Sequence, residues 1–413
     1  MILVNKLWTS TKLFATVCLI WYLSGSLYYM FTNRNIQILE VFAALIAICI
    51  FLIKKSKFVI KQDTLYILII SFCALFNLLL ISGVSFGLLF LSEVCIFVIA
   101  YVFSEKIPYE SFVMYTINII CGLALISLVG WFFSETLVDH YLVRYTGNWD
   151  IRSFYVFNIN AMFPERNSGA FWEPGMYQGY LNFAILLIIL KTKRNKWDIF
   201  RIVLLALTVF TTFSTTGYLI LAMLIMLYFR QHKNSMLRIF MSTVITIVLL
   251  FVSMNIGTII QWIESVSLYS ITSKITTGDV SFTTRIYAGF CDLIIALHNP
   301  LGADRNHLAE IVQLTAASIG KAVSARTNTF TTAFAYFGIV NGIFYISLWI
   351  KGCFKSGTNV IDKILITIII TIILSTEPHY DLLYFNIVLF YWLNLKSSKH
   401  LSNKFNVVQK SEV

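Results

Sequence analysis

The chain has 413 residues, 58% hydrophobic and 12% charged, and it carries a formal net charge of +11. Such a composition is typical of a polytopic membrane protein. The positive charge does not indicate nucleic-acid binding, because 22 of the 31 Lys and Arg residues fall in the two terminal segments and the short loops on one side of the predicted membrane bundle. The seven Cys show no metal-ligand spacing and predict no disulfide framework.

We predict an all-α fold, a single integral membrane domain over residues 1–413 with about twelve transmembrane helices. A spanning helix needs about 20 mostly apolar residues. The predicted spans are 13–31, 36–53, 65–82, 84–103, 111–133, 170–190, 199–213, 217–229, 239–260, 329–350, 364–375 and 383–395. The first is too long for a signal-peptide core and lacks a cleavage site, so we expect it to remain as an anchor.

The basic loops predict the orientation. Short loops rich in Lys and Arg stay in the cytoplasm, which places both termini inside and two long loops, 134–169 and 261–328, outside. We expect these outer loops to fold over the membrane surface and to carry amphipathic helices. Long loops of this kind often carry function.

Two helical hairpins are too short to reach the outer surface. The arms around Ser214 have about 15 residues each, or roughly 22 Å at 1.5 Å per residue, and the pair around 376–381 repeats this. Polar turns at membrane depth are tolerated when they are buried in protein or line a wet cavity. We therefore predict two recessed outer turns, with Ser214 in one and Glu377, His379 and Asp381 in the other.

The most informative segment is 166–179, RNSGAFWEPGMYQG, which opens an apolar span. Pro174 suits the first helical turn, so Glu173 should lie at the N-cap, where the helix dipole favours a carboxylate. Tyr177 and Tyr180 follow Glu173 on the same helix face. A site role for Glu173 competes with a purely structural one, in which it caps the helix and pairs with Arg166.

A second segment, 285–302, predicts an amphipathic helix on the outer surface of the bundle or bilayer. Its apolar face contains Ile286, Phe290, Leu293, Ile294 and Leu297; Arg285, Ala288, Gly289, Asp292 and Ala296 form the small or polar face. His298 is the last residue of this predicted helix. It is either a catalytic base or an ordinary residue at a helix end. Arg326 and Asn328 precede the tenth span, where Arg326 could bind substrate or simply snorkel.

Five pieces occur in a set order: RNSGAFWEPG opening a span, FSTTG at a turn, Arg285 heading the outer helix, HNPLG, and TNTFTTAFAYFGIVNG. In this order and topology, over roughly 130–345, the chain resembles the O-antigen polymerase/ligase family of bacterial membrane glycosyltransferases. Ligases of that family typically carry a His-Asn pair where this chain has Thr327-Asn328. This difference favours the polymerase branch and leaves the general base open.

The resemblance implies a metal-independent enzyme without a cofactor, in the bacterial cytoplasmic (inner) membrane with its site facing the periplasm. Its substrate would be an oligosaccharide repeat unit on undecaprenyl pyrophosphate. It would transfer the growing chain onto the next lipid-linked unit during synthesis of O-antigen (lipopolysaccharide) or a related surface polysaccharide. The expected partners of the enzyme are the surrounding membrane lipids and, as a further candidate, a protein that regulates the length of the glycan chain. The alternatives are an O-antigen ligase acting on lipid A-core and a flippase for the same lipid, although no Lys or Arg falls in the middle of a predicted span, where a transport path would need one.

The implied reaction assigns roles to the candidate residues. Guanidinium groups bind phosphate bidentately and remain ionised, so Arg166, Arg285 and Arg326 would stabilise charge on the departing pyrophosphate. Glu173 would orient or deprotonate the acceptor hydroxyl, with His298 as the second candidate. The remaining side chains expected to contact substrate are Tyr177, Ser214, Asn328 and Glu377.

Overall fold

The computed structural model describes residues 62–77, 87–146, 150–191, 194–231, 280–304, 307–321, 328–377 and 382–395, together with 43, 46, 79, 81, 379 and 380. The predicted spans 13–31 and 239–260, and nearly all of 36–53, lie outside these residues. Within them the protein is mainly helical, with one small sheet.

Nine of the predicted spans fall on described helices, with ends that differ from the prediction by a few residues. These helices are α4 (Gln62–Asn77), α5 (Gly87–Lys106), α6 (Tyr109–Phe132), α8 (Pro174–Leu190), α9 (Lys196–Thr211), α10 (Thr215–Arg230), α16 (Thr329–Ser356), α17 (Val360–Thr376) and α18 (Leu383–Asn394). Two of them, α6 and α16, are long and apolar enough to cross a membrane; α8, α10 and α18 are apolar but shorter.

Local sequence signals explain where several helices begin. In α9, Asn195 and Asp198 form a capping box in which each side chain accepts a hydrogen bond from the backbone of the other residue. In α17, Asn359 caps the helix by accepting from the Asp362 N–H. Pro174 begins α8 at a position where no backbone donor is lost.

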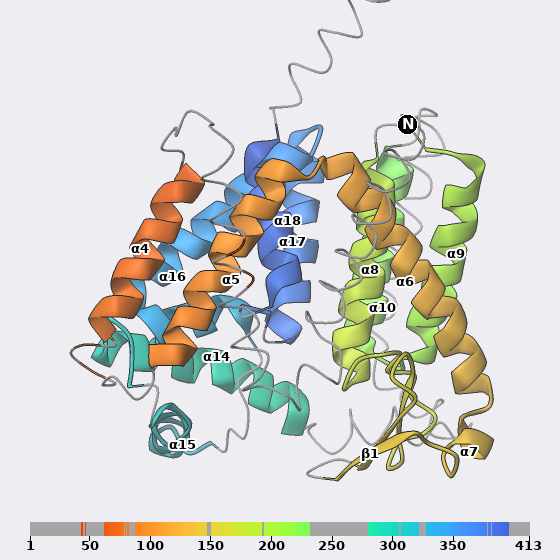
Figure 1. Cartoon of the computed structure of the whole chain (residues 1–413), viewed down its shortest axis with the longest axis horizontal. Helices are drawn as coiled ribbons and strands as arrows, with labels where there is room; N and C mark the ends of the chain where they lie inside the picture. Colours follow the sequence, from red (N-terminus) through yellow and green to blue (C-terminus); the bar gives the residue numbers. More distant parts are fainter. Residues whose placement is uncertain are drawn as a thin grey trace, which may run out of the picture.

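Helices α8 and α18 form the centre of the bundle (Figure 1). Every residue of α8 from Pro174 to Ile189 is buried, and so is α18 from Leu383 to Leu393. By contrast, the helices around them expose large apolar side chains: Phe72 on α4, Val129 on α6 and Ile199 on α9 are each more than half exposed. A helix that is apolar on all faces and central, inside a ring with apolar outer faces, is the arrangement expected in lipid.

The first outer loop differs from the prediction. We expected amphipathic helices, but its described residues form the strands β1 (Val143–Thr146), β2 (Asp150–Ser153) and β3 (Asn158–Asn160), an antiparallel sheet of order β1-β2-β3. The helix there, α7 (Ser134–Leu137), has four residues. Side chains of β2 alternate between half-buried and buried, the period of a strand, so the amphipathic-helix prediction is wrong for this loop.

The second outer loop contains the predicted amphipathic helix, α14 (Val280–His298), and a further helix, α15 (Leu308–Ser318). Figure 1 shows both at the same end of the bundle as the sheet, with α14 running across the ends of other helices. The small face of α14, with Ala288, Asp292 and Ala296, is buried, whereas Phe290 and Leu297 of the apolar face are more than half exposed. Exposure of the apolar face and burial of the small face are unfavourable in water. They are favourable where a bilayer covers the exposed apolar face.

Candidate functional site

The segment that joins the sheet to α8 is fixed by one buried amide, Asn167. Its backbone N–H donates to the Thr211 carbonyl at 2.9 Å, at the end of α9. Its side-chain amide donates to the Thr211 hydroxyl at 2.9 Å and to the Ser127 hydroxyl of α6 at 3.2 Å. Its side-chain oxygen accepts from the Gly169 N–H at 2.9 Å. Asn167 therefore binds the segment to both α6 and α9.

Strand β3 holds the same segment from the other side. The Asn158 N–H donates to the Gly169 carbonyl at 2.7 Å, and the Ser168 hydroxyl donates to the Asn158 carbonyl at 3.1 Å. The Asn158 amide donates to the Phe171 carbonyl at 3.1 Å. The sheet thus positions residues between Arg166 and Glu173, which is its clearest contribution to the site.

Glu173 lies at the predicted N-cap of α8, with extended backbone angles (φ −149°, ψ 156°). Its side chain accepts no hydrogen bond from the first turn of the helix, and it is half-buried. No ion pair joins it to Arg166 among the residues that the structure describes. The carboxylate therefore faces the positive end of the helix dipole without the capping and pairing contacts of the structural interpretation.

Arg166 lies near the end of α9 and the start of α10. Its neighbour Asn167 is bonded to Thr211, the last residue of α9, and the charge of Arg166 acts electrostatically on the phenol of Tyr218 in the first turn of α10. Tyr218 in turn donates from its hydroxyl to the Phe210 carbonyl at 2.9 Å. A guanidinium is thereby placed where these two helices meet.

The first predicted recessed turn lies beside α8, below its outer end. Ser214 caps α10 by accepting from the Gly217 N–H at 3.4 Å. Asn182 of α8 donates to the Gly217 carbonyl at 3.1 Å, and a Cβ at Gly217 would lie 3.1 Å from Gln178. Positions 178 and 182 come five and nine residues after Glu173, about 7 to 13 Å along the helix at 1.5 Å per residue. Gly217, three residues after Ser214 in this turn, therefore lies deeper in the bundle than Glu173.

The second recessed turn is held by the start of α16. The Thr329 hydroxyl donates to the Glu377 carbonyl and accepts from the His379 N–H, both at 2.8 Å. The His379 imidazole is buried, with its ring centroid 6.0 Å from that of Tyr180 and 4.4 Å from that of Phe385. Neither of its ring nitrogens has a hydrogen-bond partner in the described part of the chain. This turn also lies beside α8, through Tyr180.

Asn328 begins α16 and connects it to α14. Its side-chain oxygen accepts from the N–H groups of Phe330 and Thr331 at 3.0 and 3.2 Å. The Thr331 hydroxyl donates to the buried carboxylate of Asp292 at 2.8 Å, and a Cβ at Gly289 would lie 3.8 Å from the Asn328 amide nitrogen. The small face of α14 therefore packs on the start of α16. The pattern of small and polar residues on this face is consistent with a helix that lies on the bundle.

The remaining candidates are Tyr177, His298, Arg285 and Arg326. Tyr177 is fully buried, with its hydroxyl 2.8 Å from that of Ser127, which is a packing contact. His298 is exposed, and its Nδ1 lies 2.9 Å from the Ile294 carbonyl of its own helix. It lies 13 residues, about 20 Å, along α14 from Arg285. The backbone of Arg285 belongs to α14, whereas Arg326 lies outside the described residues.

The arginines of the sheet have structural partners. Arg144 binds Asp150 through two hydrogen bonds of 2.8 and 2.9 Å, and this guanidinium holds the pKa of the Asp150 carboxyl below its usual value. Arg152 pairs with Asp139 at 2.8 Å. Among the described residues, no three His, Cys, Asp or Glu side chains are grouped so that they could hold a metal ion.

The sequence did not identify Asn167 as the residue that fixes the segment. The available signal was an uninterrupted polar run, Arg166 to Ser168, directly before an apolar span. Asp292 was predicted only as part of a small or polar helix face, yet it is fully buried and bonded to Thr331. A carboxylate next to the small residues Ala288, Gly289 and Ala296 on one helix face was the available signal for that contact.

Comparison of the chain with family models, with curated proteins and with solved structures gave no match.

Proposed function

We propose that the protein is a polytopic membrane glycosyltransferase with about twelve transmembrane helices and both termini in the cytoplasm. The exposed apolar side chains around α4, α6 and α9, together with the outward apolar face of α14, support placement in a bilayer. The Lys and Arg asymmetry of the loops supports the orientation. The end that holds the sheet, α14 and α15 would then face the periplasm.

The reaction that we propose is polymerisation of oligosaccharide repeat units carried on undecaprenyl pyrophosphate. The observation that carries this proposal is the convergence at one end of the bundle of a half-buried carboxylate, Glu173, with two polar turns that lie below it beside α8. Polar turns at membrane depth are tolerated where they are buried in protein or line a wet cavity, and ionisable residues there mark substrate pathways. The same end holds Arg166 and the start of α14.

In the proposed reaction, a hydroxyl of the next lipid-linked unit attacks the anomeric carbon of the growing chain. A glycosidic C–O bond forms as the C–O bond to pyrophosphate breaks, and the lipid pyrophosphate leaves with the bonding electron pair. Glu173 accepts the hydroxyl proton and releases it to solvent. Arg166, Arg285 and Arg326 stabilise the negative charge that develops on the leaving group.

The remaining candidates have less direct roles in this proposal. Ser214, Asn328 and Glu377 belong to the turns and helix start that surround the site, where they order the backbone around the bound sugar. Tyr177 acts through packing, since its hydroxyl is bonded to Ser127. Asn328 lies beside Gly289 of α14, and His298 comes nine residues later in that helix, about 14 Å away at 1.5 Å per residue. We therefore place the proton transfer at Glu173.

The experiment is deletion of the gene in its native host, followed by electrophoresis of the surface glycans. A product limited to one repeat unit supports polymerisation, because ligation and flipping continue. Long polymer stranded on the lipid carrier would instead indicate the ligase, and single units trapped inside would indicate the flippase. Complementation with the wild-type gene and with the variant Glu173→Gln then tests whether this carboxylate is needed.

A further inference from the structure

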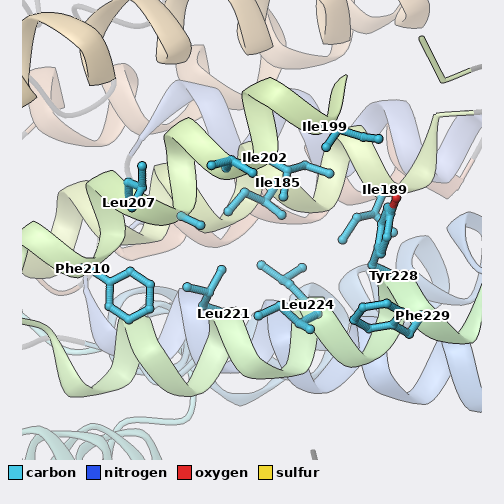
Figure 2. Close-up of a pocket in the computed structure, with 13 residues that line it drawn as sticks. Ile185, Ile189, Ile199, Ile202, Leu207, Phe210, Leu221, Leu224, Tyr228 and Phe229 are labelled. Carbon is cyan, nitrogen blue, oxygen red and sulfur yellow. The ribbon is translucent and has the colours of Figure 1, made fainter. Parts of the chain in front are cut away.

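An apolar groove runs along the bundle between α9 and α10, with α8 as its floor (Figure 2). Its volume is about 350 Å³, and the residues that line it are apolar apart from the hydroxyl of Tyr228. Figure 2 shows Phe210 and Leu221 near one end and Tyr228 and Phe229 at the other. From Ile199 to Phe210 the α9 wall extends about 16 Å at 1.5 Å per residue.

The groove is accessible from the side of the bundle. Leu207 and Phe210 of its α9 wall are both 54% exposed, and Ile225 of its α10 wall is 39% exposed. A hollow lined by large aliphatic side chains and open laterally is suited to a hydrocarbon chain, because filling it removes apolar surface from contact with solvent or restores missing dispersion contacts.

The outer end of this groove has a cation beside it. Phe210 lines the groove, its ring lies 5.5 Å from that of Tyr218, and its carbonyl accepts from the Tyr218 hydroxyl. The Arg166 guanidinium acts electrostatically on this same phenol, and Asn167 is bonded to the residue after Phe210. Arg166 therefore lies near this end of the groove, and Arg194 lies at the other end, with its guanidinium carbon 5.1 Å from the centroid of the Tyr228 ring.

We propose that this groove binds the hydrocarbon chain of a polyprenyl phosphate or pyrophosphate whose anionic head group contacts Arg166. We place the head group at the Arg166 end because that end of the bundle also holds Glu173, the carboxylate of the proposed reaction. Guanidinium is the side chain best suited to phosphate. The groove is a single channel between α9 and α10 over the floor formed by α8, so it accommodates one chain lengthwise, which favours a single-chain polyprenyl lipid over a two-chain phospholipid. The identity of the lipid rests on the proposed function; the position of the site does not.

The test uses undecaprenyl phosphate that carries a diazirine on its hydrocarbon chain, with the full-length protein in nanodiscs. After irradiation, mass spectrometry should locate adducts on α9 and α10 within the groove, and excess unlabelled undecaprenyl phosphate should suppress them. Equal suppression by phosphatidylglycerol would show ordinary bilayer lipid and overturn the proposal. So would adducts confined to other helices, or a groove occupied by a segment of this chain outside the described residues.

Two variants sharpen the result. Ala206→Trp fills the groove and should reduce crosslinking at least roughly tenfold, whereas Ala222→Trp, at a half-buried position of α10 outside the lining, should leave it within about twofold. Arg166→Gln should also weaken binding roughly tenfold, because a charge-assisted contact to phosphate is lost. Wild-type crosslinking in both Ala206→Trp and Arg166→Gln would refute the site.

This binding assay needs no catalytic turnover, so the two proposals can fail separately. Specific chain crosslinking in a protein whose deletion does not shorten the surface glycan would leave the lipid site intact and refute the polymerase. Loss of polymerisation on deletion, with no specific crosslinking in the groove, would refute the lipid site alone.

Discussion

The carbonyl oxygen of Pro300 accepts a hydrogen bond from the backbone N–H of Ile339 at 3.0 Å, within α16. Ile339 can donate there because the preceding residue, Gly338, has φ +85° and breaks the helical conformation. A second backbone bond, from Ala303 to the Ala335 carbonyl at 3.0 Å, lies on the other side of the kink. The turn that ends α14 is therefore inserted into a break in α16.

Gly338→Ala should disrupt this contact. A Cβ at this position would lie 2.0 Å from the Pro300 oxygen and would also occupy an unfavourable backbone region. We expect a loss of about 3 to 5 kcal/mol from strain and overpacking combined, measured by thermal unfolding in detergent. Gly320→Ala is the control, because Gly320 has φ +67° with no atom within 4 Å of its Cβ position. Equal losses in both variants would assign the whole effect to backbone strain.

Asn167→Ala should destabilise the segment that carries Arg166. Asn167 is buried, and the substitution removes its bonds to Ser127, Thr211 and Gly169. We expect a loss of about 2 to 4 kcal/mol and faster proteolysis of the outer loop. Asn160→Ala is the matched control, because Asn160 is half-buried and accepts one local bond from Met162. Similar proteolysis rates for the two variants would contradict the anchoring role.

The helices could be predicted because their signals are local. Apolar runs give the type of a helix, and Pro174 gave the start of α8, without knowledge of the fold. The sheet of the first outer loop could not be predicted in this way, because its strands have three or four residues and part of their stability comes from the pairing of Arg144 with Asp150. Short strands leave too few residues for a period of two to be recognised.

The site was predictable to a similar extent. Glu173 was placed at the N-cap from Pro174 alone, and the structure confirms that position. The contacts of Asn167 join it to residues 40 and 44 positions away, and the two bonds of the Thr329 hydroxyl join α16 to the turn at Glu377 and His379, 48 and 50 positions away. Such contacts depend on how the helices pack, which a single sequence does not specify.

Glu173→Gln should separate activity from stability. The carboxylate accepts no capping hydrogen bond, so the variant should lose less than about 1 kcal/mol of stability. If Glu173 accepts the proton of the acceptor hydroxyl, polymerisation should fall by about 10²-fold or more. The measurement is the length distribution of surface glycans in the deletion strain complemented at matched protein level. A wild-type distribution would remove Glu173 from the reaction.

Arg285→Lys should abolish most activity although it preserves the charge. Lysine binds phosphate as a point charge and does not reproduce the planar, bidentate contact of a guanidinium. Lys351→Arg, in the last part of α16, is a conservative control far from the outer turns. The same complementation assay applies, and glycan chains of wild-type length in Arg285→Lys would exclude this residue from the leaving-group site.

His379 should make the stability of the protein depend on pH. Burial lowers the pKa of its imidazole to about 3, whereas an unfolded histidine has a pKa near 6.5. Between these values the unfolded state binds more protons, so the stability should be constant above about pH 6.5 and decrease below it by about 1.4 kcal/mol per pH unit. His379→Gln should lack this contribution, and His298→Gln, at an exposed position, should retain it. Unfolding midpoints between pH 5 and 8 provide the measurement, and parallel curves for His379→Gln and wild type would show that His379 is not buried in its neutral form.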